Sequence, residues 1–357
     1  MTSSTEPLRI LAVSATWEGA NDYAFVRAFR RAGHSVSIVP IEDHLPRAWR
    51  SRSLRLLRRA LLRHLVRGYN QALRATAQRL RPDLFFVFKG DYVAPATLDA
   101  LRDAGCISIN FYPDTGFSDH GPWLPRAISR YDWVFTTKTA GVDDLARNYA
   151  QPRASFVPHA FDPEVHRPWP MSASDHALYD CDLSFIGNWS SKKGATMAAA
   201  CTRLADLDIR IWGAARWRGE GGGAGQRFQG RGTFGAEYAK AILGSRINLG
   251  LLFEGGPSAP RGDLITARTF EIPATGGFML HERNEEVEEY FTDGIDCAMF
   301  GNLDELVDKT RYYLTHRDER ERIAAAGRAL VHNAGFAVDE RVRLVLDKYA
   351  EIRSARA

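Results

Sequence analysis

The chain alternates short apolar runs with longer segments in which apolar residues recur every three or four positions. Short apolar runs are typical of buried strands, and the longer spacing is typical of amphipathic helices. Segments such as "NDYAFVRAFRRAG" and "PATLDALRDAG" fit helices, and the strand-like runs of the first half are "RILAVSAT", "SVSIVPI", "DLFFVFKG", "CISINFYPD", "YDWVFTTK" and "ASFVPHAFD". This alternation predicts a parallel, doubly wound α/β sheet.

The same alternation starts again in the second half, with strands "CDLSFIGN", "DIRIWGA", "INLGLLF" and "GGFML", and the patterns past residue 303 are all helical. We therefore expect two Rossmann-like domains, 1–163 and 179–337, with a linker at 164–178 and a last helix, 338–357, that returns to the first domain. The glycine-rich stretch 216–232 lacks the GK[ST] ending of a P-loop, so we expect a mobile loop there.

Composition excludes several classes of protein. The chain of 357 residues is 45% hydrophobic, which is ample for two cores, and no apolar run approaches the roughly 20 residues of a membrane helix. The start "MTSSTEP" has no charged leader, so we expect a cytoplasmic protein. Its four cysteines lie far apart without the spacing of metal ligands, which predicts buried thiols and neither a disulfide framework nor a zinc site.

Charge is spread unevenly along the chain. The net charge of +4 argues against a nucleic-acid partner, yet no acidic residue occurs between Asp43 and Asp83. A basic helix at 47–81 is predicted there, because apolar residues recur at helical spacing at Leu54, Leu57, Leu61 and Leu65. Three alternatives stay open: a structural helix on the sheet, peripheral contact with anionic lipid at the inner face of the membrane, or a site for an anionic soluble acceptor.

The stretch "DLITARTFEIPATGGFML", which starts at Asp263, combines acidic residues with a helix start. The preceding strand ends at Phe253, and the helix begins near Ile265 or Thr266. Ligands of parallel sheets lie at the carboxyl ends of strands, where the next helix offers N–H groups to phosphate. Carboxylates on either side suit the hydroxyls of sugar rings, so a nucleotide-sugar fits. The alternative is an ordinary helix with an i,i+3 ion pair between an arginine and a glutamate.

This stretch resembles the E-x7-E signature of GT-B-fold glycosyltransferases, and its form is similar to the CgeB-like branch, also described as spore maturation proteins. The resemblance covers most of residues 155 to 335. It implies that Asp263 faces the donor sugar and Glu271 holds the ribose hydroxyls, with Asp263 departing from the usual glutamate. It also implies a hexosyltransferase-type enzyme that retains the anomeric configuration, with a UDP-, GDP- or dTDP-linked sugar as co-substrate and no further cofactor.

The resemblance extends to a turn that in related enzymes reads G-R-(x)n-K-G and binds the diphosphate. Here "FIGNWSSKKG" places Asn188 where the arginine is expected, and Lys192 or Arg268 could supply the missing charge. The alternative is a solvated helix start. The nucleobase is expected near "GTFG". The expected donor-binding residues are Gly187, Asn188, Lys192, Lys193, Thr233, Phe234, Asp263, Thr266, Arg268 and Glu271.

Candidates for catalysis lie after strands of the first, acceptor-binding domain. Asp114, in "NFYPDTGFSDH", is the first choice as base or acceptor-positioning residue, with His120 beyond it and Glu18 after the first strand. A turn residue after proline is the alternative for Asp114. No DxD motif stands in a suitable setting, so we expect no metal. Two other functions stay open: a nucleotide-sugar epimerase, and a non-catalytic nucleotide-sugar-binding or assembly protein. The acceptor is unknown: a glycan, a lipid-linked molecule or a small molecule.

Overall fold

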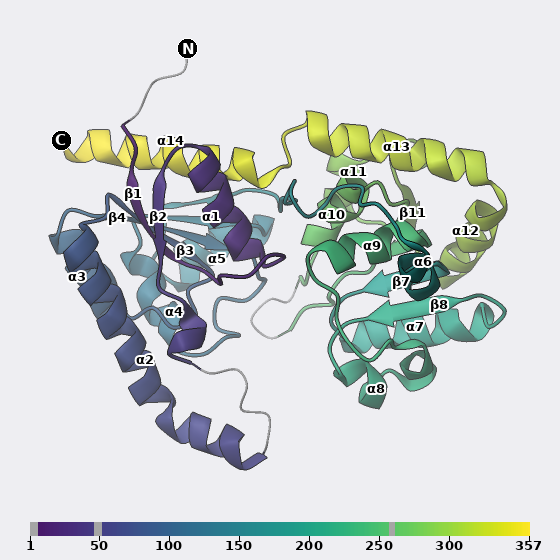
Figure 1. The fold of residues 1–357 in the computed structure, drawn as a ribbon, viewed down its shortest axis with the longest axis horizontal. Coiled ribbons are helices and arrows are strands. Elements are labelled where there is room, and N and C mark those ends of the chain that lie inside the picture. Colours follow the sequence, from purple (N-terminus) through teal and green to yellow (C-terminus); the bar gives the residue numbers. More distant parts are fainter. Residues whose placement is uncertain (1–5, 46–51, 257–260) are drawn as a thin grey trace. The chain divides into compact units, whose positions relative to one another are not determined.

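The computed structural model describes residues 6–45, 52–256 and 261–357, without the side chains of 52–59. The chain forms two compact units, one of Met1–Pro158 with Asp339–Ala357 and one of His159–Val338 (Figure 1). The division falls at Pro158 and His159, shortly before the expected boundary at 163. Residues 164–178, expected as a linker, lie within the second unit, where Ser172 caps helix α6 (Ala173–Tyr179).

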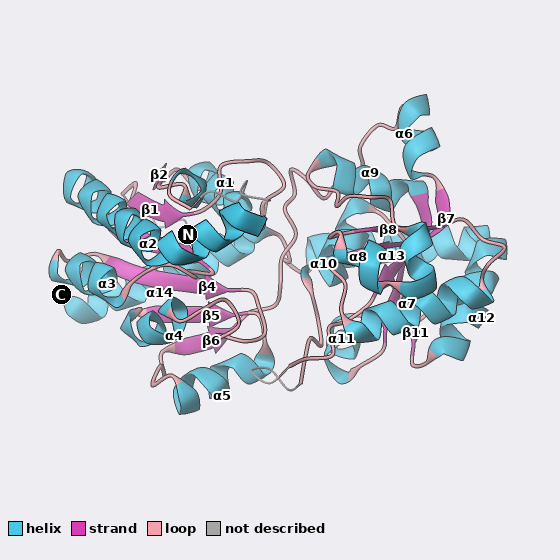
Figure 2. Cartoon of the chain, turned by 90° about the horizontal axis from the view of Figure 1, so that it is seen from below, coloured by secondary structure: helices cyan, strands magenta, loops and turns pink. Residues whose placement is uncertain are grey.

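The first unit is built on a six-stranded parallel sheet with the order β2-β1-β3-β4-β5-β6. Figure 2 shows its strands side by side among the helices. The strands are β1 (Arg9–Val13), β2 (Ser35–Ile38), β3 (Leu84–Phe88), β4 (Ile107–Tyr112), β5 (Trp133–Thr136) and β6 (Ala154–Phe156). The inner strands β3 and β4 are almost wholly buried and coincide with continuous apolar runs, because strands covered on both faces have few polar positions.

The helices of the first unit are α1 (Asn21–Arg31), α2 (Arg52–Leu80), α3 (Pro95–Asp103), α4 (Trp123–Ala127), α5 (Thr139–Asn148) and α14 (Val338–Arg356). Residues 47–51 of the predicted basic helix lie outside the described residues. The second half of α2 packs on the core through buried Val66, Tyr69 and Leu73. That half is therefore an ordinary structural helix. Within the described ranges, no helix has an apolar stretch that could span a bilayer.

The last helix, α14, belongs to the first unit from Asp339 onward. Asp339 forms an ion pair with Arg31 of α1 at 2.9 Å. The Nζ of Lys348 lies 3.9 Å from the ring centroid of Trp133, and Arg356 pairs with Asp132 near the end of the chain. These contacts fix the helix along its length.

The second unit contains a five-stranded parallel sheet with the order β11-β10-β9-β7-β8. Its strands are β7 (Cys181–Ile186), β8 (Ile209–Trp212), β9 (Ser245–Gly250), β10 (Met279–Glu282) and β11 (Ala298–Phe300). Besides α6, its helices are α7 (Ser191–Arg203), α8 (Arg216–Glu220), α9 (Ala236–Gly244), α10 (Ala267–Thr275), α11 (Glu285–Tyr290), α12 (Leu303–Thr315) and α13 (Arg317–Asn333). The doubled architecture predicted from the sequence is confirmed, and the four cysteines are free and buried.

The prediction of a mobile loop at 216–232 is wrong. This stretch forms α8 and a 3-10 helix (Gly222–Arg227). Trp217 is fully buried there, and its indole N–H donates to the carbonyl oxygen of Gly187 at 2.8 Å. The buried tryptophan anchors the glycine-rich stretch because an indole in a core needs both apolar contacts and an acceptor for its N–H.

Candidate functional site

The strand order of the second sheet reverses between β7 and β9, since β8 lies on one side of β7 and β10 on the far side of β9. In open parallel sheets this switch point opens a crevice at the carboxyl ends of the strands, where ligands bind. Gly187 follows β7 directly, and Leu251 follows β9. Residues of this unit that bind a donor should therefore lie near these two positions.

Arg268 of α10 lies at the switch point. Its Nη2 donates to the carbonyl oxygen of Leu251 at 2.9 Å, and its guanidinium carbon lies 5.3 Å from the ring centroid of Phe185. A Cβ atom on Gly187 would lie 2.8 Å from Nη1 of Arg268. A side chain after β7 would therefore displace the guanidinium and press on the ring of Phe185, whose nearest carbon would also lie 2.8 Å away.

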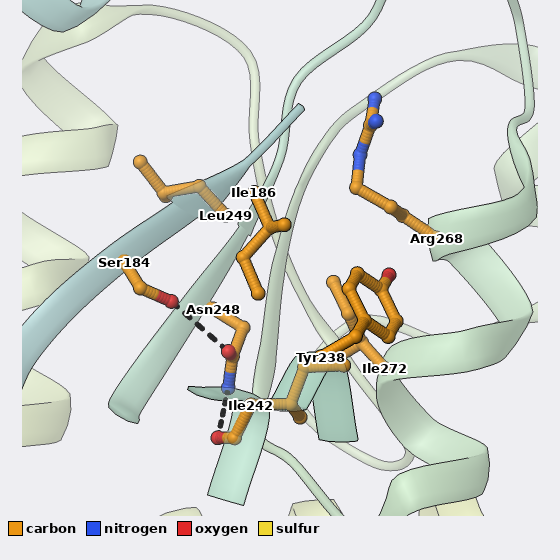
Figure 3. Close-up of a pocket in the computed structure, with 8 residues that line it drawn as sticks. All are labelled: Ser184, Ile186, Tyr238, Ile242, Asn248, Leu249, Arg268 and Ile272. Atoms are coloured by element: carbon orange, nitrogen blue, oxygen red, sulfur yellow. Dashed lines mark hydrogen bonds between the residues drawn. The ribbon is translucent and has the colours of Figure 1, made fainter. Parts of the chain in front are cut away.

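A small pocket lies beneath Arg268, lined by Ser184, Ile186, Tyr238, Ile242, Asn248, Leu249, Arg268 and Ile272 (Figure 3). Its empty space of about 170 Å³ includes open solvent, so the side chains leave no enclosed cavity for a ligand there. The hydroxyl of Ser184 donates to Asn248 at 3.0 Å, and Asn248 donates to the carbonyl oxygen of Ile242 at 3.2 Å. The pocket is therefore a small packing defect below the site, and a nucleotide does not fit into it.

A chain of hydrogen bonds fixes the start of α10. The backbone N–H of Thr266 donates to the hydroxyl of Thr269 at 3.1 Å, and that hydroxyl lies 3.0 Å from Nε2 of His281. The Nδ1 of His281 lies 2.7 Å from the carbonyl oxygen of Glu282, so Nδ1 carries the proton and Nε2 accepts. Burial lowers the pKa of His281 to about 4, which keeps it neutral. Thr266 thus serves as the N-cap residue, and the first N–H groups of α10 lack partners within the helix.

Lys193 is buried near Arg268, and the carboxylates of Asp263, Glu254 and Glu282 offset its charge only in part. Its ammonium lies 5.9 Å from the ring centroid of Phe253, and no salt bridge to it occurs in the described part of the chain. Burial and the neighbouring charge of Arg268 lower the pKa of Lys193 to about 8. Two cations therefore gather beside the start of α10, an arrangement that an anion between them would stabilise.

The two carboxylates near Lys193 that form short contacts have other partners. Glu254 accepts a hydrogen bond from the Ser190 hydroxyl at 2.5 Å and from the backbone N–H of Lys192 at 3.2 Å. Glu282 accepts from the backbone N–H of Leu252 and forms an ion pair with the ammonium of Lys192. A carboxylate of the protein itself thus lies at the start of α7. Of the two cations expected to replace the missing arginine, Arg268 is the one at the switch point.

Glu271 is buried one turn further along α10, with one oxygen held. The hydroxyl of Tyr238 donates to its Oε2 at 2.7 Å, and the Nε2 of His166 lies 3.8 Å from its Oε1. No ion pair joins Arg268 to Glu271 in the described ranges, so the ordinary i,i+3 pair considered for this helix is not formed. Asp263 lies in the preceding loop, where its backbone N–H donates to the carbonyl oxygen of Phe253 at 2.9 Å.

The segment expected at the nucleobase follows the end of β8. The backbone N–H of Gly213 donates to the carbonyl oxygen of Arg231 at 3.1 Å, which ties this segment to the strand end. The hydroxyl of Thr233 is buried and has no hydrogen-bond partner among the described residues, and the side chain of Phe234 is 61% exposed. Asn188 is exposed after β7. An unpaired hydroxyl beside an exposed ring suits a planar polar ligand.

In the first unit, Asp114 follows β4 and joins Lys89 and His120 in a cluster. Its Oδ2 lies 2.7 Å from the ammonium of Lys89 and 2.9 Å from Nε2 of His120. Burial raises the pKa of Asp114, but the hydrogen bond from His120 and the charge of Lys89 outweigh it and hold that pKa far below its usual range. The same hydrogen bond raises the pKa of His120 against the effect of burial. Asp114 is therefore a weak base, and His120 is the better candidate.

Glu18 is not part of the cluster around Asp114. It is exposed in the loop after β1, and no contact in the described residues joins it to Asp114 or His120. The described part of the chain contains no group of three or more histidine, cysteine or acidic side chains that could hold a metal ion. The sequence also gave no indication of Tyr238, His166 or His281 as parts of the site.

Residues 193–347 match a family model described as glycosyl transferase-like, which is under half of the chain. No curated protein sequence shows significant similarity. Among solved structures, sucrose-phosphate synthase from Thermosynechococcus elongatus has a TM-score of 0.65 and 14% identity, over 98% of this chain and 100% of that one. HepE from Anabaena, in complex with UDP and glucose, has a TM-score of 0.61 and 12% identity, over 96% of this chain and 100% of that one.

A third similar structure is described as a UDP-N-acetylglucosamine 2-epimerase from Listeria monocytogenes, with a TM-score of 0.50 and 11% identity over 92% of this chain and 94% of that one. Identities this low establish the fold alone. The two Rossmann-like units therefore form the GT-B fold, as expected from the sequence.

Proposed function

We propose that this protein is a glycosyltransferase that takes its sugar from a nucleotide-diphosphate donor bound by the second unit. The observation that carries the proposal is the pair of cations at the switch point. Lys193 and Arg268 lie beside the start of α10, and among the described residues no carboxylate forms a salt bridge with either. A diphosphate supplies negative charge for both cations, whereas a neutral ligand would add nothing to the charge that offsets the buried ammonium.

The same groups account for the chemistry. Breaking the bond between sugar and diphosphate places charge on the leaving phosphate, and cations with helix N–H groups stabilise that charge. Lys193, Arg268 and the start of α10 can do so without a metal ion, and Glu271 can accept a ribose hydroxyl. The complex of HepE with UDP and glucose makes a UDP-hexose the first donor to test. The D-x4-R-x-F-E form of "DLITARTFE" supports a place in the CgeB-like branch.

The first unit would bind the acceptor, with His120 deprotonating its hydroxyl. Asp114 would orient His120 and stabilise the imidazolium that forms, because a carboxylate paired with the ammonium of Lys89 and with His120 is itself too weakly basic. Asp263 and Glu271 together favour retention of the anomeric configuration, and the anomeric proton of the product in a ¹H NMR spectrum distinguishes retention from inversion. The basic stretch without acidic residues between Asp43 and Asp83 supports peripheral contact with anionic lipid through the basic helix.

A thermal-shift screen tests the donor. The protein would be heated with UDP, GDP, dTDP, CDP and their common sugars in EDTA, beside Glu271→Ala, since a ligand of the folded state raises the melting temperature. We expect a rise with one nucleotide family that is reduced in the variant. No rise with any nucleotide would contradict the proposal and favour a binding or assembly role.

A nucleotide-sugar epimerase is the second candidate, because one similar structure is described as such an enzyme. Incubation with a UDP-sugar and no acceptor separates the two functions. Isomerised donor would identify an epimerase, whereas a transferase leaves the sugar configuration unchanged until an acceptor is added.

A further inference from the structure

Two side chains from separate segments lie against the carboxylate of Glu271. Tyr238 comes from α9, and His166 comes from the segment between the unit boundary and α6. The rings of His166 and Tyr238 pack edge to face, with centroids 5.5 Å apart and planes at 77°. All three residues are buried, with 9% exposure or less. Because buried rings in contact have few alternative rotamers, this packing restricts where the carboxylate can lie.

The phenol of Tyr238 can only donate to Glu271. Burial and the negative charge of Glu271 raise the pKa of Tyr238 well above its ordinary value, so the hydroxyl keeps its proton. Its hydrogen bond to Oε2 measures 2.7 Å, an ordinary length for a hydroxyl donor. One oxygen of the carboxylate is therefore fixed.

His166 presents a proton to the other oxygen. Its Nδ1 accepts a hydrogen bond from the backbone N–H of Asp162 at 2.9 Å, which leaves the proton of the neutral ring on Nε2. That Nε2 lies 3.8 Å from Oε1, which is too far for a hydrogen bond. At this distance the N–H dipole still attracts the carboxylate and favours the position in which Oε1 faces the ring. Oε1 accepts no hydrogen bond in the described part of the chain.

We infer that Tyr238 and His166 are positioning residues which hold Glu271 so that its Oε1 accepts a hydroxyl of the donor ribose. The inference rests on the proposed function, since it requires a nucleotide in this unit. Fixing the carboxylate beforehand lowers the ordering cost of binding, so the gain from each ribose hydroxyl depends on the two positioning residues. Loss of either residue should therefore reduce the preference for ribose over deoxyribose nucleotides while the protein stays folded.

The test compares affinities for UDP, 2′-deoxy-UDP and 3′-deoxy-UDP by isothermal titration calorimetry. A hydrogen bond to a charged group is worth enough that the wild type should prefer UDP to at least one deoxy analogue by about 10-fold or more. In Tyr238→Phe this ratio should fall to about 3-fold or less, since a carboxylate that is not fixed has to be ordered on binding. Tyr179→Phe, which removes a buried phenol elsewhere in the unit, should keep the full ratio.

Two variants of His166 separate positioning from packing. His166→Asn keeps an acceptor near Nδ1 and removes the Nε2 proton, whereas His166→Gln keeps a donor near Nε2. We expect the ratio to fall in the first and to persist in the second. Tight binding of UDP with an unchanged ratio in Tyr238→Phe and His166→Asn would overturn the inference and leave the proposed function standing. Failure of the folded wild type to bind UDP would count against the proposed uridine donor.

Discussion

Replacing Lys193 with methionine should stabilise the free protein and weaken donor binding at the same time. The pKa of this lysine is about 8 against an ordinary 10.5, a shift whose largest cause is burial. Since one pKa unit corresponds to about 1.4 kcal/mol, keeping the ammonium charged at pH 7 costs the folded state about 3 kcal/mol. Methionine has a similar length and no charge, so Lys193→Met should recover part of that cost.

The sign of the pH dependence follows from the lowered pKa. Between about pH 8 and pH 10.5 the unfolded chain binds the lysine proton while the folded chain releases it. Unfolding free energy contributed by this residue therefore rises with pH through that window, and the cost is fully present below pH 8. Lys193→Met lacks this dependence, so the stability gap between variant and wild type should close as the pH rises.

Binding should change in the opposite direction. The ammonium must be protonated to hold a phosphate, so Lys193→Met should weaken UDP affinity by about 10- to 100-fold at pH 7. In the wild type, affinity should fall above pH 8 and approach a decline of about 10-fold per pH unit. Scanning calorimetry measures the stability without ligand, and isothermal titration in EDTA measures the affinity. Lys240→Met is the control, because it removes a cation that pairs with Asp175 at 2.8 Å and should keep UDP affinity.

A less stable Lys193→Met with unchanged UDP affinity would refute this reasoning. It would mean that other groups of the folded protein offset the charge of the ammonium and that Lys193 stabilises α7. The anion site at the switch point would then lose the cation that distinguishes it from an ordinary helix start.

Three further predictions concern neighbouring features. Gly187→Ala places a Cβ atom 2.8 Å from Nη1 of Arg268, so UDP affinity should fall by about 10-fold with an unchanged circular dichroism spectrum; equal affinity would remove the guanidinium from the phosphate site. Asp114→Asn removes the hydrogen bond that raises the pKa of His120, so the acidic limb of the kcat/KM profile should move to lower pH, while abolished activity at every pH would make Asp114 the base. Trp217→Phe removes the N–H bonded to Gly187 and should lower the free energy of unfolding by about 1 to 3 kcal/mol in urea denaturation, and no change would show that this bond is not needed.

The doubled fold was predictable because strands buried on both faces appear as continuous apolar runs. "DLFFVFKG" and "CISINFYPD" became β3 and β4 at nearly the expected bounds. The stretch 216–232 was mispredicted because its glycines suggested mobility, while the decisive contact, from Trp217 to Gly187, joins residues 30 positions apart. Composition within one segment carries no record of such a partner.

Which lysine of "SSKKG" faces inward could have been found from the sequence. Lys193 shares a helical face with Met197, Ala200 and Cys201, all buried, whereas Lys192 lies on the next face. The surroundings of Glu271 could not have been found from the sequence, since Tyr238 lies 33 positions away on another helix. A chain pattern predicts the phase of a helix, but the contacts between two helices depend on how the sheet brings them together.

Binding of a nucleotide diphosphate at the switch point of the second sheet can be seen directly in a crystal structure of the protein with UDP. We expect phosphate oxygens within hydrogen-bond distance of Lys193 and Arg268, next to the start of α10, and a ribose hydroxyl on Oε1 of Glu271. A nucleotide bound elsewhere, with Lys193 and Arg268 as they are in the free protein, would contradict this expectation.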